Sequence, residues 1–203
     1  IFEFTVESVQ TAESNASDLL WAGYGKDYIM PSDENYFADG KLKFKFDHAL
    51  TLLKVQLTLG TEFNHNGVPE NNPVSELKID GFKPTVSVSY GSLTSSGNAT
   101  EIQAYQSAWE KAEDKTKNCV ATFECIVVPQ TLEDNMKKFT VNFICGGKPY
   151  TYTASLANNF RGFIGGTAYT LPLTVGKDEV IMSKDGITAS PWGDGGRTDI
   201  ETD

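Results

Sequence analysis

Few residues in this chain have the type and spacing that catalysis needs. The chain has two histidines, His48 and His65, and His48 directly follows Asp47. Neighbouring residues of an extended strand point to opposite faces, so Asp47 and His48 do not form a catalytic pair. The nucleophile motif Gly-x-Ser-x-Gly does not occur. The sequence therefore predicts no catalytic residue and no enzyme; we interpret His48 as structural and His65 as a solvated loop residue.

Patterns that bind metals or cofactors are missing as well. The chain contains no Cys-x-x-Cys or His-x-x-x-His pair, no phosphate-binding glycine loop and no dinucleotide motif. Asp33 with Glu34, and Asp194 with Asp199, could hold calcium weakly, but neither pair has the spacing of an EF-hand loop. We interpret these acids as solvated and expect neither a metal nor a cofactor.

The three cysteines, Cys119, Cys125 and Cys145, are too few and too unevenly spaced for a disulfide framework. Cys119 and Cys125 fall in one expected strand, roughly 20 Å apart at about 3.3 Å per residue, which is too far for a bridge. A bridge between Cys125 and Cys145 stays open if their strands pair. The favoured interpretation is three buried thiols that behave as small hydrophobic residues.

Charge and length limit the class of protein. The 203 residues carry 27 acidic and 17 basic side chains, a net charge of −10. Nucleic acids and anionic membrane surfaces attract basic patches, so we expect neither as a partner. No apolar run reaches the roughly 18 residues of a membrane span. The chain begins Ile1-Phe2-Glu3 with no methionine and no signal pattern, so we expect that its true start was removed, either by natural processing or when the protein was prepared for expression.

Alternating apolar residues predict that β-strands make up most of the fold. A period of two is typical of strands with one buried and one solvated face. Turn-forming pairs such as Asn66-Gly67 and Gly165-Gly166 separate these stretches, which favours a sandwich or a barrel. The pattern is clearest in residues 2–6, 42–46, 53–59, 86–90, 119–127, 139–145 and 169–175.

Other stretches are predicted to connect these strands. Residues 106–117 could form a short surface helix or a long polar loop, and residues 64–73 and 91–100 read as loops. We expect a first domain portion at 1–82, a second domain at 83–192 and an acidic flexible tail at 193–203.

The segment "LKFKFDHALTLLKVQLTLG", residues 42–60, interrupts its own strand pattern. Leu50 and Leu53 are three residues apart, which predicts one helical turn joining two strands that lie in opposite sheets. Each buried apolar side chain here would contribute roughly 1.5–3 kcal/mol. The predicted core motif consists of Phe46, His48, Leu50, Leu53, Val55 and Leu57.

The C-terminal part predicts a strand that could leave its own subunit. Pro172 lies in an alternating stretch, and a residue without an N–H group belongs on an edge strand. An edge beside a separable terminal strand is what strand exchange between subunits requires. The apolar residues of that terminal strand are Val180, Ile181, Met182, Ile187 and Trp192.

Four motifs, in this order, resemble the fimbrillin family, the type V pilins and pilin-like surface proteins of anaerobic gut and oral bacteria. Each motif alone is weak, but the four together span residues 18–192. They are Asp18-Leu19-Leu20-Trp21-Ala22; Phe46-x-His48-x-Leu50-x-x-Leu53-x-Val55-x-Leu57; Val127-Val128-Pro129-Gln130; and Phe160-x-Gly162 with Gly166-x-x-Tyr169-x-Leu171, followed by Ile187 and Trp192.

The resemblance implies an all-β fold of tandem transthyretin-like β-sandwich domains with few short helices, the N-terminal domain being incomplete in this chain. It also implies export as a lipoprotein precursor to the outer membrane, and removal of the first strand by an extracellular protease. A strand from the next subunit would then fill the opened groove. On this resemblance, Val180, Ile181, Met182, Ile187 and Trp192 form the donor strand.

We therefore expect a pilus subunit or pilin-like adhesin of the cell surface that assembles by strand complementation with other pilin subunits, in homo- or heteropolymers. The alternative is a monomeric module that binds a host glycan or matrix protein without polymerising. In that case loops 61–73 and 91–118 would carry recognition. Exposed aromatic residues such as Trp21, Tyr24 and Tyr28 could form a sugar platform, although such residues more often pack in cores or interfaces.

Overall fold

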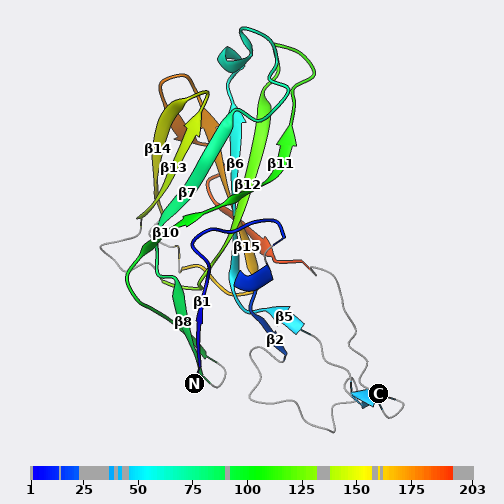
Figure 1. Ribbon diagram of the computed structural model, residues 1–203, viewed down its shortest axis with the longest axis vertical. Helices are drawn as coiled ribbons and strands as arrows, with labels where there is room; N and C mark the ends of the chain where they lie inside the picture. Colours follow the sequence, from blue (N-terminus) through cyan, green and yellow to red (C-terminus); the bar gives the residue numbers. More distant parts are fainter. Residues whose placement is uncertain are drawn as a thin grey trace.

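The strands expected from the alternation form an open, layered β structure. The computed structural model describes residues 2–13, 15–22, 37–38, 41–42, 46–89, 92–131, 138–156, 160 and 162–193. The all-β class is confirmed, because apart from two short 3-10 turns the regular elements of the described residues are strands (Figure 1). The 3-10 turns are η1 (Asn15–Ser17) and η2 (Thr61–Asn64).

The strands run in a simple chain order from β1 to β17. Their bounds are β1 (Phe2–Thr5), β2 (Leu20–Ala22), β3 (Phe37–Ala38), β4 (Lys41–Leu42), β5 (Phe46–His48), β6 (Thr51–Leu59), β7 (Val74–Phe82), β8 (Thr85–Ser89), β9 (Ser92–Ser96), β10 (Thr100–Gln103), β11 (Tyr105–Glu110), β12 (Cys119–Val127), β13 (Lys138–Cys145), β14 (Lys148–Ser155), β15 (Thr167–Val175), β16 (Val180–Met182) and β17 (Thr188–Pro191).

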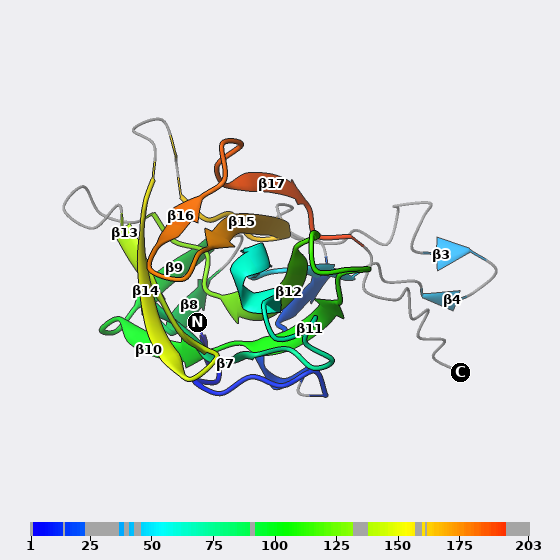
Figure 2. The same ribbon diagram turned by 90° about the horizontal axis from the view of Figure 1, so that it is seen from above.

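Two large sheets face each other. The six-stranded sheet has the order β11-β12-β6-β15-β16, with β17 also paired to β15, and the four-stranded sheet has the order β10-β7-β13-β14. Neighbouring strands within these two sheets pair antiparallel, except β6 and β15, which are parallel. Seen end-on, the two layers enclose the core, and β16 lies beside β14 (Figure 2). The chain passes from one sheet to the other at Ala104, between β10 and β11.

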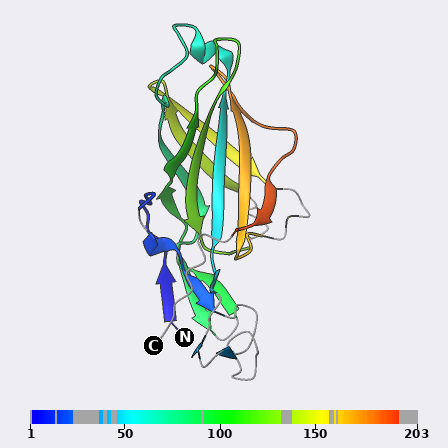
Figure 3. The ribbon, with the colours of Figure 1, turned by 90° about the vertical axis from the view of Figure 1, so that its right-hand side faces the viewer.

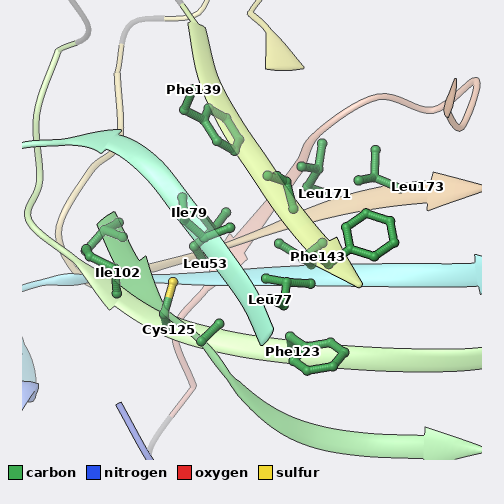
Figure 4. Close-up of a cluster of buried hydrophobic side chains, with 14 of the residues drawn as sticks. Leu53, Leu77, Ile79, Ile102, Phe123, Cys125, Phe139, Phe143, Leu171 and Leu173 are labelled. Carbon is green, nitrogen blue, oxygen red and sulfur yellow. The ribbon is translucent and has the colours of Figure 1, made fainter. Parts of the chain in front are cut away.

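The core fills the space between these sheets. Period-two burial in β6, β12, β13 and β15 turns every second side chain inward, as alternation predicts. Figure 4 shows the inward side chains of both sheets meeting. The central ones are Leu53, Leu77, Ile79, Ile102, Phe123, Cys125, Phe139, Phe143, Leu171 and Leu173, each at most 4% exposed.

Smaller sheets lie at one end of the sandwich. β1, β8 and β9 form a three-stranded sheet, and β2 pairs with β5. Both lie beyond the same end of the long strands (Figure 3). β3 and β4 form a further two-stranded pair.

The predicted helical turn in the leucine segment is wrong. β6 runs without interruption from Thr51 to Leu59; it pairs along its whole length with β12 and from Leu52 to Leu59 with β15. A central strand satisfies its backbone groups on both sides, which outweighs the three-residue spacing of the leucines. The chain does change sheet here, but it comes from the small β2–β5 sheet rather than from the opposite layer of the sandwich.

Two predicted connections are strands instead. Residues 106–117 were predicted as a short surface helix or a long polar loop. Residues 105–110 instead form β11, which pairs with β12 at the edge of the larger sheet, and residues 111–117 lie in the loop between these two strands. Residues 92–96 form β9, the partner of β8, within the stretch expected as a loop. In both places pairing with an available neighbouring strand outweighs the local polar composition.

Pro172 does not mark an edge strand. β15 has β6 on one side and β16 and β17 on the other. The Pro172 carbonyl accepts a hydrogen bond from Ser183 N at 2.9 Å, so the backbone of Pro172 faces the outer side. There, β16 has ended opposite Leu173 and β17 begins opposite Thr170. Pro172 lies between these two paired stretches of β15, so its missing N–H group removes no hydrogen bond to β16 or β17.

The expected boundary between residues 82 and 83 does not separate two sets of sheets. β6 lies between β12 and β15, and β7 lies between β10 and β13. Strands from before residue 82 are therefore interior members of both large sheets. The expected tail at 193–203 lies outside the described residues except for Gly193.

Candidate functional site

Reactive side chains do not gather in the described part of the chain. There, no group of three or more His, Cys, Asp or Glu residues could hold a metal. Cys119, Cys125 and Cys145 are free and buried. β12 and β13 do not pair, and both thiols are free, so the bridge between Cys125 and Cys145 that the sequence left open is not formed. Burial raises the pKa of Cys125 to about 12 and that of Cys145 to about 11, so both thiols stay protonated and unreactive.

Several residues considered from the sequence cannot be placed. Asp33, Glu34, Tyr24 and Tyr28 lie outside the described residues, as do the acids of the tail. Trp21 lies in β2 and packs, partly buried, against the core.

The C-terminal segment, residues 180–192, lies at the outer side of β15. β16 pairs with Leu173–Val175, and β17 pairs with Thr167–Thr170. Residues 183–187 pass between them, and Gly186 N closes a turn on Ser183 O at 3.0 Å. The segment thus forms two short strands paired to one edge of the large sheet, and β16 also lies beside β14 without pairing to it.

Side-chain burial in this segment is sparse. All four residues of β17 are exposed, and Ile181 is 51% exposed. The apolar side chains that pack, partly buried, against the core are Val180, Met182, Ile187 and Trp192. Of the predicted donor residues, Ile181 is the one that faces solvent. Main-chain pairing with β15 and these four side chains therefore hold the segment in place.

Trp192, the last residue of the segment, packs against His48. Its indole ring stacks on the His48 imidazole, with ring centroids 3.9 Å apart and planes 7° apart. His48 Nδ1 is 2.9 Å from Asp18 Oδ1. Trp192 N donates to Gly166 O at 2.8 Å, which extends the β17 pairing by one residue. We call Asp18, His48 and Trp192 the C-terminal anchor.

The first two motifs of the sequence meet at this anchor. Leu20 in β2 pairs with His48 in β5, and Ala49 N donates to Leu19 O at 2.8 Å. The carboxylate beside His48 is therefore Asp18 from the first motif, not the adjacent Asp47. Asp18 was not predicted as the partner of His48, although the order of the two motifs in the sequence was a signal that could have identified it.

The last motif supplies the backbone that lies against the anchor, residues 162–166. Gly166 N donates to Leu50 O at 2.8 Å. Gly166 has φ +69°, and a Cβ added there would come within 3.3 Å of His48 O. Glycine therefore allows both the left-handed turn and the close approach of the two backbones. Tyr169 fixes the preceding turn, because its hydroxyl accepts from Ile164 N and donates to Gly162 O, both at 3.2 Å.

The third motif connects residues 162–166 to the rest of the sandwich. Gln130 exchanges two backbone hydrogen bonds with Phe163, at 3.1 and 2.9 Å. Its side chain accepts from Lys83 N at 3.1 Å and donates to Lys83 O and Val128 O. Gln130 is 8% exposed, and this buried role was not predicted from the sequence.

The other end of the C-terminal segment is held separately. Tyr150 OH donates to Lys177 O at 2.9 Å, and Lys177 N donates to Glu62 Oε1 at 2.9 Å. Lys148 pairs with Asp178 at 2.8 Å, but exposed pairs of this kind contribute little. The turn before β16 is thus tied to β14 and η2, at the opposite end of the C-terminal segment from the anchor.

The predicted core motif divides into two parts. Leu50, Leu53, Val55 and Leu57 are at most 1% exposed and lie in the core. His48 belongs to the anchor, and Phe46 is 41% exposed in β5, outside the sandwich core. β5 ends before the sandwich begins, which explains why burial starts only after His48.

Comparison with known proteins gives a consistent result. A family model described as fimbrillin-like matches residues 1–192. No curated protein matches the chain. The fold is similar to a "putative cell adhesion protein" from Bacteroides uniformis, with a TM-score of 0.60 and 18% identity over 95% of this chain and 66% of that chain.

A second protein with the same description, from Bacteroides ovatus, gives a TM-score of 0.50 at 14% identity, over 90% of this chain and 63% of that chain. The chain therefore spans slightly less than two thirds of the length of these two structures.

Proposed function

Because this chain belongs to the fimbrillin-like family, we propose that it is a structural, non-enzymatic protein of the cell surface, a fimbrial subunit or adhesin. In this proposal its C-terminal segment, with Val180, Ile181, Met182, Ile187 and Trp192, docks into a neighbouring subunit as a donor strand. Its partners are other pilin subunits, in homo- or heteropolymers, and it reaches the outer membrane as a lipoprotein precursor.

The observation that carries the proposal is the position of the C-terminal segment. It occupies a sheet edge through two short strands, β16 and β17. A strand at an edge can leave without breaking the pairing of the strands inside the sheet. Here its departure would leave β6 and β15 paired and the core cluster between the sheets in place.

The energy of docking would come from backbone and side chains together. Each backbone hydrogen bond contributes about 0.5–1.5 kcal/mol net, in the original subunit as in the next one. The free energy of docking is therefore most favourable for side chains that the groove of the next subunit buries more completely than the segment's position beside β15 does. Ile181, at 51% exposed, and the partly buried Val180 and Met182 have the most to gain.

No helix among the described residues is long and apolar enough to cross a membrane. In this proposal a lipid on the precursor attaches the protein to the outer membrane.

A reversible lock tests whether the segment must leave its own subunit. Thr167 and Pro191 lie directly opposite each other in β15 and β17. Cysteines at both positions are close enough for a cross-strand disulfide. We expect the oxidised Thr167→Cys/Pro191→Cys protein to stay monomeric in size-exclusion chromatography and electron microscopy, and to form fibres once it is reduced. The Thr167→Cys single variant controls for the substitution.

Two results would contradict the proposal. One is equal fibre formation by the oxidised and the reduced protein. The other is fibre formation by a chain that lacks residues 177–203, because deletion of the donor should abolish assembly and leave a monomer.

One observation supports the alternative of a binding module. Two loops meet at the end of the sandwich opposite the small sheets: Asn64 Nδ2 donates to Lys117 O at 2.7 Å, and Lys115 Nζ donates to His65 O at 3.3 Å. Loops 61–73 and 111–118 could thus present one recognition surface. Saturable binding of a glycan or matrix protein by a chain that never assembles would favour this alternative.

A further inference from the structure

We propose that the C-terminal anchor of Asp18, His48 and Trp192 holds the C-terminal segment on its own subunit, and that opening of the His48–Trp192 stack is the step that releases it. The effect of release on assembly rests on the proposed function. The opening itself is a property of the monomer and can be measured without any assembly.

Apart from its main-chain pairing with β15 and the partly buried Ile187 that precedes it, β17 is held mainly by the anchor. All four of its own side chains are exposed, so they contribute little burial of apolar surface. The interval at Pro172 also separates β17 from β16. The stacked indole of Trp192 and its N–H bond to Gly166 O are the contacts that close this end.

The His48 side chain under Trp192 is mostly buried and hydrogen-bonded. The His48 side chain is 12% exposed and the Asp18 side chain 21%, so the bond between them is partly shielded from water. His48 also lies in β5, whose backbone pairs with β2. Asp18 thus acts as a positioning residue, because it fixes the orientation of the imidazole on which the indole stacks.

The two ends of the segment are held differently, which sets the direction of opening. The turn before β16 is held by Tyr150 and Glu62 through the backbone of Lys177. Gly176 N also donates to Glu179 O at 2.8 Å within that turn. Release of Trp192 therefore frees β17 first, while the turn at 176–179 remains as the hinge.

Hydrogen exchange of the monomer, followed by mass spectrometry, tests the anchor. In His48→Ala we expect the amides of residues 188–190 and 192 to exchange on the order of tenfold faster, because a stacked aromatic pair is lost. The peptide covering β12 should keep its protection, which shows that the variant is folded. His65→Ala is the matched control, since it removes the other histidine from an exposed loop and should change nothing in residues 188–192.

The Asp18 variants separate positioning from general stability. Asp18→Asn keeps an oxygen that accepts from the imidazole, so we expect wild-type protection of residues 188–192. Asp18→Ala should lose part of that protection, with β12 again unchanged. Unchanged exchange of residues 188–192 in both His48→Ala and Asp18→Ala would overturn the proposal, as would an equal loss in Asp18→Asn and Asp18→Ala.

Assembly kinetics then distinguish this inference from the proposed function. His48→Ala leaves every donor residue in place, so faster opening should bring faster fibre formation. Faster exchange in a protein that never forms fibres would support the anchor and contradict donor-strand assembly. Fibre formation at the wild-type rate, together with faster exchange, would show that opening does not control release.

Discussion

At the scale of single residues, two buried glutamines act in place of backbone amides. Gln10, 4% exposed, accepts from Ile126 N at 2.7 Å and donates to Ile126 O at 2.8 Å, where β11 no longer covers β12. Gln130 makes the same kind of reciprocal pair with Lys83. No buried side-chain nitrogen or oxygen of the described residues lacks a partner, so these carboxamides complete the hydrogen bonding at the ends of strands.

The buried thiols make the free energy of unfolding fall as the pH rises above 9. The pKa values of Cys125 and Cys145, about 12 and about 11, lie above the ordinary value of 9.0. Above pH 9 the thiols therefore ionise in the unfolded chain but not in the folded one. We expect the free energy of unfolding to fall by about 1 kcal/mol per thiol between pH 9 and 10. Urea unfolding at a series of pH values measures this slope.

A Cys125→Ala/Cys145→Ala variant provides the control for the alkaline slope. Its overall stability will be lower because cavities form, but its slope between pH 9 and 10 should be shallower than that of the wild type. Identical slopes in the two proteins would contradict the assignment to these thiols.

At the scale of elements, the backbone at residues 162–164, which contacts both Gln130 and the Tyr169 hydroxyl, depends on a glycine. Gly162 has φ +119°, and a Cβ there would lie 2.8 Å from Gln130 O. Gly97 has φ +85°, but a Cβ there would meet nothing closer than 3.9 Å. The two positions thus separate backbone strain from a steric clash.

We expect Gly162→Ala to destabilise the protein by about 3 kcal/mol or more, because strain and overpacking add at a backbone contact that cannot yield. Gly97→Ala should cost only about 1 kcal/mol, the contribution of backbone strain. Chemical denaturation of both variants measures the difference. Equal losses would mean that the contact with Gln130 relaxes freely.

At the scale of the whole molecule, the sandwich is built from both halves of the chain. β6 and β7 come from before residue 82, and each lies between strands that come from after it. We therefore expect fragments 1–82 and 83–203, expressed separately, to lack cooperative unfolding in circular dichroism, because each would expose unpaired interior strands. Co-expression should restore a folded complex. A cooperative transition in either fragment alone would support a domain boundary at residue 82.

The sequence alone determined what depends on the period of the pattern. Alternation in residues 119–127 and 169–175 predicted strands and their buried faces, and the burial of Cys125 and Leu171 followed from it. This works because a side chain's face in a strand depends only on its position along that strand. The family resemblance was likewise present in the order of four short motifs.

Tertiary structure alone decided which strands pair and which distant side chains meet. The period of β15 is the same at an edge as in the interior, so Pro172 predicted an edge that β16 and β17 occupy. Asp18, His48 and Trp192 share no local pattern; they meet because β2, β5 and the end of β17 converge there. Pairing depends on hydrogen bonds between segments far apart in the chain, and a local period carries no information about that choice of partner.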